Sequence, residues 1–298
     1  MLTSKTTGER IRCERAADPD YLNEVLSELS FRLPRVRVCV IGESVMGRSI
    51  SVVSVGDCPY SRGVLYVGGF EGTDPFSPAV LLRFLCELAE GAEADKRLYN
   101  VRLSKMLESC TVHVLPMLNP DGYAMVRHGA EGIPIRERLI RQNGSEDFSE
   151  WVKNARGVEL AANFRDGEIS ADGVSAGSEP EVEALCSWVR LADGATGGLD
   201  LSLTLLPGEE PLRYRSGKVM PTRAGTIGRL LAQMTGATVC RDSPEGRSFP
   251  DWFMRETGKP AISFGCFPDG QKERAKDASD YGIAYQALRE ALFSAPML

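Results

Sequence analysis

The chain has 298 residues, 43% of them hydrophobic and 26% charged, which is enough to build one large domain around a substantial core. Lysine and arginine together number 35 against 41 aspartates and glutamates, and the net charge of -6 argues against a basic nucleic-acid-binding face. Residues 1–20 lack the apolar centre of a signal peptide, and no run of about 18 apolar residues is present to span a membrane. We therefore expect a cytoplasmic protein with no nucleic-acid or membrane partner.

Cysteines and histidines limit the chemistry that the chain can perform. The eight cysteines include no C-x-x-C pair and mostly have apolar neighbours in the sequence, so we expect reduced, packed thiols rather than disulfides or a zinc site. There are only two histidines, His113 and His128, and any chemistry that needs imidazole depends on them.

Helix and strand patterns alternate from end to end. The first predicted helix begins at Pro19, because Asp18 is a favourable N-cap residue and proline is favoured at the first helical position. Apolar patterns predict strands at 36–41, 50–55, 64–67, 111–115, 199–205 and 260–264. Further helices are predicted from Ser77, after Ser178–Glu181 with its capping-box spacing, over 220–234 with Gly236 as the stop, and over 279–293.

This alternation predicts the α/β class, with one domain built on a mixed, largely parallel central sheet flanked by helices. We expect residues 1–35 to form an N-terminal segment with one helix and residues 36–298 to form the main domain. The stretch from Asn119 to about Ser178 is predicted to be long and irregular, and such stretches inside compact domains usually carry function.

Four separated motifs then follow one another in the chain. They are Ile41-Gly42-Glu43-Ser44 with Gly47-Arg48-Ser49-Ile50, Gly68-Gly69-Phe70-Glu71-Gly72-Thr73-Asp74, Pro116-Met117-Leu118-Asn119-Pro120-Asp121-Gly122-Tyr123, and Trp151 with Asn154-Ala155-Arg156-Gly157-Val158-Glu159-Leu160. Taken alone, Asn119-Pro120-Asp121-Gly122 has the chemistry of a turn. Together the motifs resemble the zinc carboxypeptidase family, the carboxypeptidase A-like metallopeptidases, and most of all its bacterial gamma-D-glutamyl-L-diamino-acid endopeptidase branch. The resemblance covers roughly residues 36 to 293 and implies the family's phosphorylase/hydrolase-like fold.

The resemblance also implies where the active-site residues should stand, and at each position this chain differs. Family members hold zinc with an H-x-x-E pair and a later histidine, and a glutamate activates the water. The register implied by the motifs puts Glu71 and Asp74 at the first two ligands, Leu205 at the third to within one residue, and Gly265 at the base. Leucine and glycine cannot supply these functions.

The substrate-binding positions differ as well. Ala161 and Ala162 replace the family's Asn-Arg pair that holds a substrate carboxylate, and only Asn163 of that polar cluster is kept. Arg156 remains a candidate for anion recognition, with Arg136, Arg138 and Arg141, although arginines on loops are usually solvated or paired locally. Glu209 and Glu210 would flank the cleft, as a plain charged loop or as a site for a cationic ligand.

Other chemistry remains open from the residues alone. Glu71 and Asp74 could share a hard cation with water, or could be a solvated pair at a helix start. Cys266 or Ser263 could act as a nucleophile, but no histidine lies near them in the sequence, and a buried strand end is the simpler interpretation. His113 fits a packed core residue, and His128 fits a solvated loop.

We therefore predict a catalytically inactive zinc carboxypeptidase-like protein, a pseudoenzyme of bacterial type without a cofactor, that binds a peptide or a peptidoglycan fragment in its cleft. The alternative is an active metallocarboxypeptidase or gamma-D-glutamyl-diamino-acid endopeptidase that uses zinc at an altered site. A third hypothesis is a purely structural protein whose cleft is closed by Leu205 and Phe264.

Overall fold

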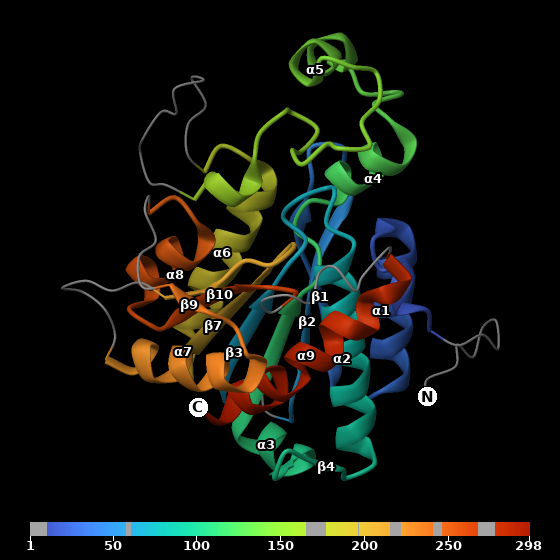
Figure 1. The fold of residues 1–298 in the computed structure, drawn as a ribbon. Coiled ribbons are helices and arrows are strands. Elements are labelled where there is room, and N and C mark those ends of the chain that lie inside the picture. Colours follow the sequence, from blue (N-terminus) through green and yellow to red (C-terminus); the bar gives the residue numbers. More distant parts are fainter. Residues whose placement is uncertain are drawn as a thin grey trace.

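The computed structural model describes residues 11–57, 61–164, 177–195, 197–214, 222–240, 246–267 and 278–298. Its main element is an eight-stranded sheet with the order β1-β2-β6-β3-β7-β10-β8-β9 (Figure 1). The strands are β1 (Val36–Glu43), β2 (Ser49–Val55), β3 (Arg62–Val67), β6 (Cys110–Leu115), β7 (Leu199–Leu206), β8 (Leu212–Tyr214), β9 (Val239–Cys240) and β10 (Ala261–Gly265). A separate two-stranded sheet joins β4 (Arg97–Leu98) to β5 (Val101–Arg102).

The four central strands β6, β3, β7 and β10 are parallel neighbours, while β1 and β2 run antiparallel to the strands beside them. Strand β8 is antiparallel to β10 and parallel to β9. The mixed, largely parallel sheet predicted from the sequence is therefore confirmed. All six predicted strands are present with nearly the predicted bounds. The short strands β8 and β9 were not predicted, because two or three residues show no usable periodicity.

Helices cover both faces of the sheet. They are α1 (Pro19–Arg32), α2 (Phe76–Glu93), α3 (Leu103–Ser109), α4 (Pro120–His128), α5 (Arg136–Asn143), α6 (Pro180–Gly194), α7 (Thr222–Thr235), α8 (Phe249–Thr257) and α9 (Tyr281–Ser294), with single turns at η1 (Cys13–Arg15), η2 (Leu160–Ala162), η4 (Ala278–Asp280) and η5 (Ala295–Met297). One hydrophobic core joins α1, α2, α3, α7 and α9 to one face, and a second joins α6 and α8 to the other (Figure 1). No helix in the described part of the chain is long and apolar enough to cross a membrane.

The predicted helix starts are confirmed at α1 and corrected at α6. The Asp18 carboxylate accepts hydrogen bonds from the Asp20 and Tyr21 amides, as its N-cap position predicts. At α6 the predicted capping box is wrong, because the N-cap residue is Glu179 and the Ser178 hydroxyl donates to the Glu179 carboxylate instead. The predicted start of α7 near residue 220 lies outside the described residues.

Within the predicted irregular stretch from Asn119 to Ser178, residues 119–164 are described, and they are less irregular than predicted. Asn119 is an N-cap residue whose side chain accepts from the Gly122 amide, and Pro120 occupies the first helical position. The Asn-Pro-Asp-Gly sequence therefore begins helix α4 rather than forming an isolated turn. Helix α5 follows, and both pack around a small third core formed by Met125, Ala130, Ile133, Leu139, Phe148, Trp151 and Ala155. We refer to this region as the α4–α5 lobe; in Figure 1 it lies at the top of the view.

Candidate functional site

The segments that carry the motifs meet at one edge of the sheet. Because β6, β3, β7 and β10 are parallel neighbours, their carboxyl ends lie together, and this is the edge at which open α/β sheets bind ligands. Gly72 after β3 is packed tightly here: a Cβ atom on it would lie 2.6 Å from the carbonyl oxygens of both Gly122 and Trp151. The second, third and fourth motifs thus form one interlocked scaffold.

Buried polar groups connect the same motifs. The Asn119 amide donates to the Phe70 carbonyl over 2.9 Å. The Asp121 carboxylate, which is fully buried, accepts from the Ser44 hydroxyl at 2.8 Å, the Met46 amide at 2.8 Å and the Arg48 guanidinium at 2.7 Å. The loop of the β1–β2 hairpin is therefore fastened to α4, and these polar groups have a structural role.

Asn154 connects the fourth motif to the start of α6 through buried hydrogen bonds. Its amide donates to the Glu179 carboxylate at 2.7 Å and to the Glu181 carboxylate at 3.2 Å, and both glutamates are buried. Burial raises the pKa of Glu181. Arg156 is exposed and lies 3.9 Å from Glu179, so this candidate for anion recognition is paired with a local acid.

Asp74, one of the two positions proposed for the first metal ligands, is a helix cap. One carboxylate oxygen accepts from the Phe76 amide at 2.9 Å and the Ser77 amide at 3.1 Å, and the other accepts from the Ser77 hydroxyl. That hydroxyl in turn accepts from the Gly69 amide at 2.9 Å. Burial raises the pKa of Asp74, and these hydrogen bonds oppose the rise. Both oxygens are thus engaged by the start of α2, which favours the helix-start interpretation of Asp74 over metal binding.

Glu71 has a different environment, although it lies only three residues away. Its side chain is half-buried, and the charged groups around it are the carboxylates of Asp74, Glu159 and Glu210. Burial, together with these negative charges, raises the pKa of Glu71 to about 7. The carboxyl group is therefore partly protonated near neutral pH.

The register of β7 distinguishes Leu205, at the predicted third-ligand position, from the residues on either side of it. Leu205 pairs with Phe264, and both side chains are buried in the core on the α2 and α9 side. Gly265 pairs with Leu206, and side chains alternate between the two faces of a strand, so Thr204 and Leu206 share the face of Gly265 while Leu205 does not. The hypothesis that Leu205 and Phe264 close the cleft is wrong for the same reason.

Backbone occupies the space beside Gly265, the predicted position of the general base. A Cβ atom on Gly265 would lie 2.4 Å from the Glu210 amide nitrogen and 2.4 Å from the Gly208 carbonyl oxygen. Three backbone hydrogen bonds hold this loop in place: Gly265 donates to Glu210 at 2.8 Å, Cys266 to Leu206 at 2.9 Å and Phe267 to Gly208 at 3.0 Å. No side chain fits at residue 265 unless this backbone moves. We call residues 206–210 the covering loop.

The positions that match the family's substrate-binding segment lie on and after η2. Ala161 packs against the second core, Ala162 is exposed, and Asn163 is buried, with its backbone carbonyl accepting from the Gly177 amide at 2.7 Å. Glu209 is exposed at the tip of the covering loop. The two alanines supply no charged or hydrogen-bonding side chain for a substrate carboxylate.

The remaining candidates are not arranged for catalysis. His113 is hydrogen-bonded to the Ser54 hydroxyl at 2.8 Å and packs edge-on against Trp188, and burial lowers its pKa to about 4. It is the packed core residue that the sequence predicts. His128 ends α4 and is exposed, so it belongs to a helix rather than to the predicted loop.

The proposed nucleophiles are buried at the end of β10. Burial raises the pKa of the Cys266 thiol well above its usual value, which opposes formation of a nucleophilic thiolate. Ser263 is also buried. Of the three α5 arginines, Arg136 lies 3.3 Å from Glu146 and Arg141 lies 4.0 Å from Glu137, while Arg138 is exposed.

These residues do not fit the family's zinc site. Asp74 is committed to a helix cap, no histidine lies at either predicted position, and the place of the base is filled by backbone. Within the ranges that the structure describes, no three histidine, cysteine, aspartate or glutamate side chains are grouped so as to hold a metal ion.

Sequence reasoning missed the covering loop and the convergence of Glu159 and Glu210 on Glu71. The one-residue uncertainty of the predicted register already allowed Thr204 at the ligand position, and Thr204 shares the face of Gly265. The approach of Glu159 has no local signal in the sequence.

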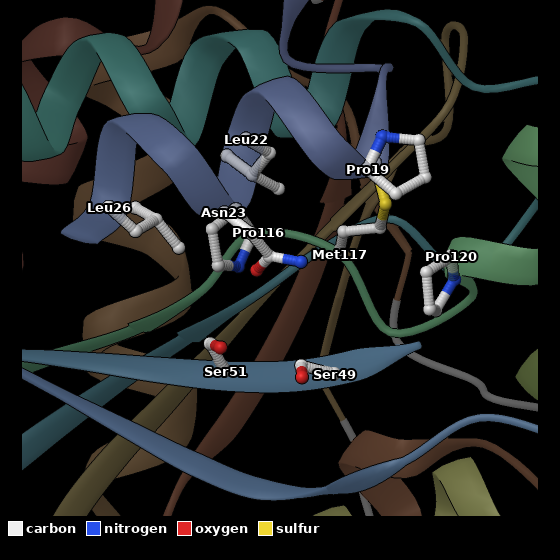
Figure 2. A pocket seen from close by; sticks show the side chains of 9 residues that line it. All are labelled: Pro19, Leu22, Asn23, Leu26, Ser49, Ser51, Pro116, Met117 and Pro120. Carbon is white, nitrogen blue, oxygen red and sulfur yellow. The ribbon is translucent and has the colours of Figure 1, made fainter. Parts of the chain in front are cut away.

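A small, shallow crevice lies elsewhere, between α1, β2 and the segment that joins β6 to α4 (Figure 2). Asn23 of α1 and Ser49 and Ser51 of β2 line it together with apolar side chains such as Leu22 and Met117. None of the candidate site residues lines this crevice.

Comparisons of the sequence with family models and with known proteins agree on one family. A family model described as zinc carboxypeptidase matches residues 22–217. The mouse carboxypeptidase N catalytic chain is 29% identical over 196 residues, which cover 57% of this chain and 39% of that protein. The gamma-D-glutamyl-L-diamino acid endopeptidase 1 of Lysinibacillus sphaericus is 19% identical over 274 residues, covering 87% of this chain and 67% of that protein.

Solved structures agree on the fold. The carboxypeptidase A of Helicoverpa armigera superposes with a TM-score of 0.68 at 17% identity, covering 97% of this chain and 74% of that chain. Bovine thrombin-activatable fibrinolysis inhibitor superposes with a TM-score of 0.71 at 15% identity, covering 96% and 98%. At these identities the likeness establishes the architecture, and the chemistry depends on the residues at the site.

Proposed function

Because this chain belongs to the zinc carboxypeptidase family, we propose that it is a non-catalytic member that retains the fold and binds a peptide, without zinc, at the edge where its relatives have an active site. The observation that carries the proposal is the backbone of the covering loop beside Gly265. A missing glutamate could be a simple substitution, but here the carbonyl of Gly208 and the amide of Glu210 fill the space.

The use of Asp74 supports the same proposal. A carboxylate that caps a helix through both oxygens would have to break those hydrogen bonds to bind a metal. Each hydrogen bond to a charged group is worth about 1.5 to 3 kcal/mol. The free energy lost with the helix cap would therefore offset much of the free energy of metal binding that one additional oxygen ligand supplies.

For the ligand, we propose a cell-wall peptide that carries a diamino acid. The relative that covers 87% of this chain is named a gamma-D-glutamyl-L-diamino acid endopeptidase. A diamino acid has a free amine that is positively charged at neutral pH, and the carboxylates of Glu159 and Glu210, the latter 3.5 Å from Arg213, supply complementary charge. A bound amine would also favour the ionised form of Glu71. The proposal locates the protein in the cytoplasm, where its described cysteines, all free thiols, would stay reduced.

Metal analysis tests the non-catalytic part of the proposal. The full chain is expressed with added zinc, dialysed, and measured by mass spectrometry for bound metal, and it is incubated with a panel of peptides with and without a chelator. We expect no stoichiometric zinc and no chelator-sensitive cleavage. Near-stoichiometric zinc with cleavage that a chelator abolishes would instead establish the alternative, an active peptidase with an altered metal site.

Calorimetry with synthetic peptides tests the ligand. A peptide with gamma-D-glutamyl linked to a diamino acid is compared with the same peptide in which alanine replaces the diamino acid. Glu71→Gln should weaken binding of the first peptide about 10-fold, because one charge-assisted contact is lost. Glu131→Gln, an exposed change in the α4–α5 lobe, is the matched control. Equal affinity for the two peptides would contradict the proposed ligand while leaving the zinc result intact.

A further inference from the structure

The outer edge of strand β1 is open. The strand comes first in the order of the eight-stranded sheet, so it pairs with β2 on one side and with no other strand of the described chain on the other. Val38 packs against the core under α1 and Ile41 against the core under α6, so these helices lie over the two faces of the strand. Cys39 and Val40 between them are exposed. Such an edge offers backbone groups with which another strand can pair.

The hydrogen bonds of the β1–β2 hairpin show which peptide groups point outward. The Gly56 amide donates to the Arg35 carbonyl at 3.2 Å, one step before the pair of Val36 with Val55. Peptide groups along an antiparallel strand alternate between its two sides. Residues 35, 37 and 39 therefore bond to β2, and the amides and carbonyls of Val38 and Val40 point to the open side.

This edge is complementary to itself about a two-fold axis at Cys39. In an antiparallel pair of two β1 strands, Val38 of one copy would exchange both backbone hydrogen bonds with Val40 of the other, and the axis repeats the exchange. A register centred on Val38 would need the Val36 amide, which already donates to the Leu33 carbonyl at 2.9 Å. A register centred on Val40 would run into the bulge between Val40 and Gly42. The free amides thus select the register centred on Cys39.

The same pairing would cover apolar side chains that are exposed in the single chain. Val40 is 57% exposed, and it shares the face of Val38, on which α1 lies. Antiparallel pairing places Val40 of one copy beside the start of β1 in the other. Phe31, which is 90% exposed, lies at the end of α1 shortly before that start. The pairing therefore brings Val40 close to the apolar end of a second α1 helix.

Charges on the strand favour a second, antiparallel copy as the occupant of the edge. Arg37 stands near the start of β1 and Glu43 at its end, and neither has an ion-pair partner among the described residues. Antiparallel pairing puts the basic start of each strand beside the acidic end of the other, whereas parallel pairing would put like charges together. The bulge turns the two side chains to opposite faces, so their attraction acts within a Debye length of about 8 to 10 Å and selects the orientation.

We propose that the protein self-associates through β1, as a two-fold symmetric dimer in which the two sheets join antiparallel with Cys39 of each copy at the axis. A two-fold contact uses the β1 edge of both copies, so it closes and does not extend into a fibre. The paired segment is short, and we expect a weak dimer whose formation depends on concentration. The proposal depends neither on the peptide ligand nor on the absence of zinc.

Sedimentation of the full chain under reducing conditions tests the dimer, over a range from about 1 to about 300 µM. We expect the mass to rise from 32.5 kDa toward twice this value. Val40→Lys, which places a charge at the edge, should stay monomeric over the whole range. Met297→Lys is the matched control, because Met297 is 56% exposed and lies in η5, which contacts Arg62 of β3. It should associate like the native chain.

Thiol cross-linking tests the register. Cys39 faces its copy as a non-hydrogen-bonded pair, with Cα atoms about 4.5 Å apart, and a disulfide spans about 4.4 to 6.8 Å. Diamide at high protein concentration should therefore trap a dimer that dithiothreitol releases. Cys39→Ser should abolish the trapped dimer and leave sedimentation unchanged, while Cys240→Ser should still be trapped. Val40→Lys keeps Cys39 but should be trapped at least about 10-fold more slowly, because association comes first.

Circular dichroism checks that each variant is folded. A native chain that stays monomeric at the highest concentration would overturn the proposal and would leave the edge to some other strand. Sedimentation or trapping of Val40→Lys equal to that of the native chain would also overturn it, as would a trapped dimer joined through cysteines other than Cys39.

Discussion

At the scale of single residues, Glu71 and Asp74 show how position decides the chemistry of a carboxylate. Asp74 is the more buried of the two, yet backbone amides and a serine hydroxyl satisfy its charge at the start of α2. Glu71 has three carboxylates near it, so its charged form is disfavoured. Hydrogen bonds at the start of α2 limit the rise in the pKa of Asp74, whereas the neighbouring carboxylates add to the rise in the pKa of Glu71.

Glu71 therefore predicts a pH dependence of stability. Its pKa in the folded protein, about 7, lies above the ordinary value of 4.5, so the folded state binds the proton more tightly than the unfolded state does. The stabilisation is fully present below about pH 4.5 and is lost as the pH rises through about 7. Because the side chain is partly exposed, solvent screening reduces the effect to about 1 to 2 kcal/mol.

Urea unfolding at about pH 5 and about pH 8 measures this effect. Glu71→Gln should have a higher free energy of unfolding than the native chain at the higher pH. Its free energy of unfolding should also decline less than that of the native chain between the two pH values. Glu150→Gln, an exposed change in the α4–α5 lobe, should keep the native decline. An unchanged pH dependence in Glu71→Gln would show that the carboxyl group is not held near its acidic neighbours.

At the scale of elements, the covering loop follows β7 and is hydrogen-bonded to the carboxyl end of β10. The backbone amides of residues 265–267 donate three hydrogen bonds to carbonyl oxygens of this loop. Glycine at position 265 allows the two backbones to approach this closely, because it has no Cβ atom. The loop and the glycine thus depend on each other.

Gly265→Ala should destabilise the protein by about 2 to 3 kcal/mol, because its new methyl group meets backbone that is fixed by hydrogen bonds rather than a flexible side chain. The free energy of unfolding in urea is the measurement. Gly282→Ala is the matched control, since a Cβ atom there, near the start of α9, has open space around it. That change should be neutral or stabilising by up to about 1 kcal/mol. Equal effects of the two substitutions would mean that the loop does not cover Gly265.

At the scale of the whole molecule, the sheet and its helices form two large cores, while the α4–α5 lobe has a small core of its own. The lobe is attached to the sheet through the motif contacts around Gly72, Asn119 and Asp121. Its helices are short, with nine and eight residues. Local stability should therefore differ between the lobe and the sheet.

Hydrogen exchange followed by mass spectrometry should resolve this difference. Amides of α5 are expected to exchange at least about 10-fold faster than those of β3, β6 and β7, because fewer buried apolar contacts must be lost to expose them. Comparable protection in α5 and in the central strands would show that the lobe and the sheet unfold as one unit.

Much of the fold could be predicted from local patterns. Continuous apolar stretches predicted the central strands, and Asp18 followed by Pro19 predicted the start of α1, because caps and periodicity are properties of neighbouring residues. The same approach misjudged Asn119, since Asn-Pro-Asp-Gly suits either a turn or a helix start, and the packing of the α4–α5 lobe selects the helix.

Some features of the candidate site could likewise be predicted from the sequence, and others depend on the tertiary structure. From the sequence we could count two histidines and predict, from the motif register, that neither stands at a ligand position. The three-dimensional contacts were needed to show that Asp74 is a cap, that Leu205 faces the core, and that the covering loop fills the space at Gly265. These facts depend on strand register and on contacts between residues far apart in the chain. A one-residue shift in register turns every side chain of a strand to the other face, and no local pattern around Leu205 records which face it takes.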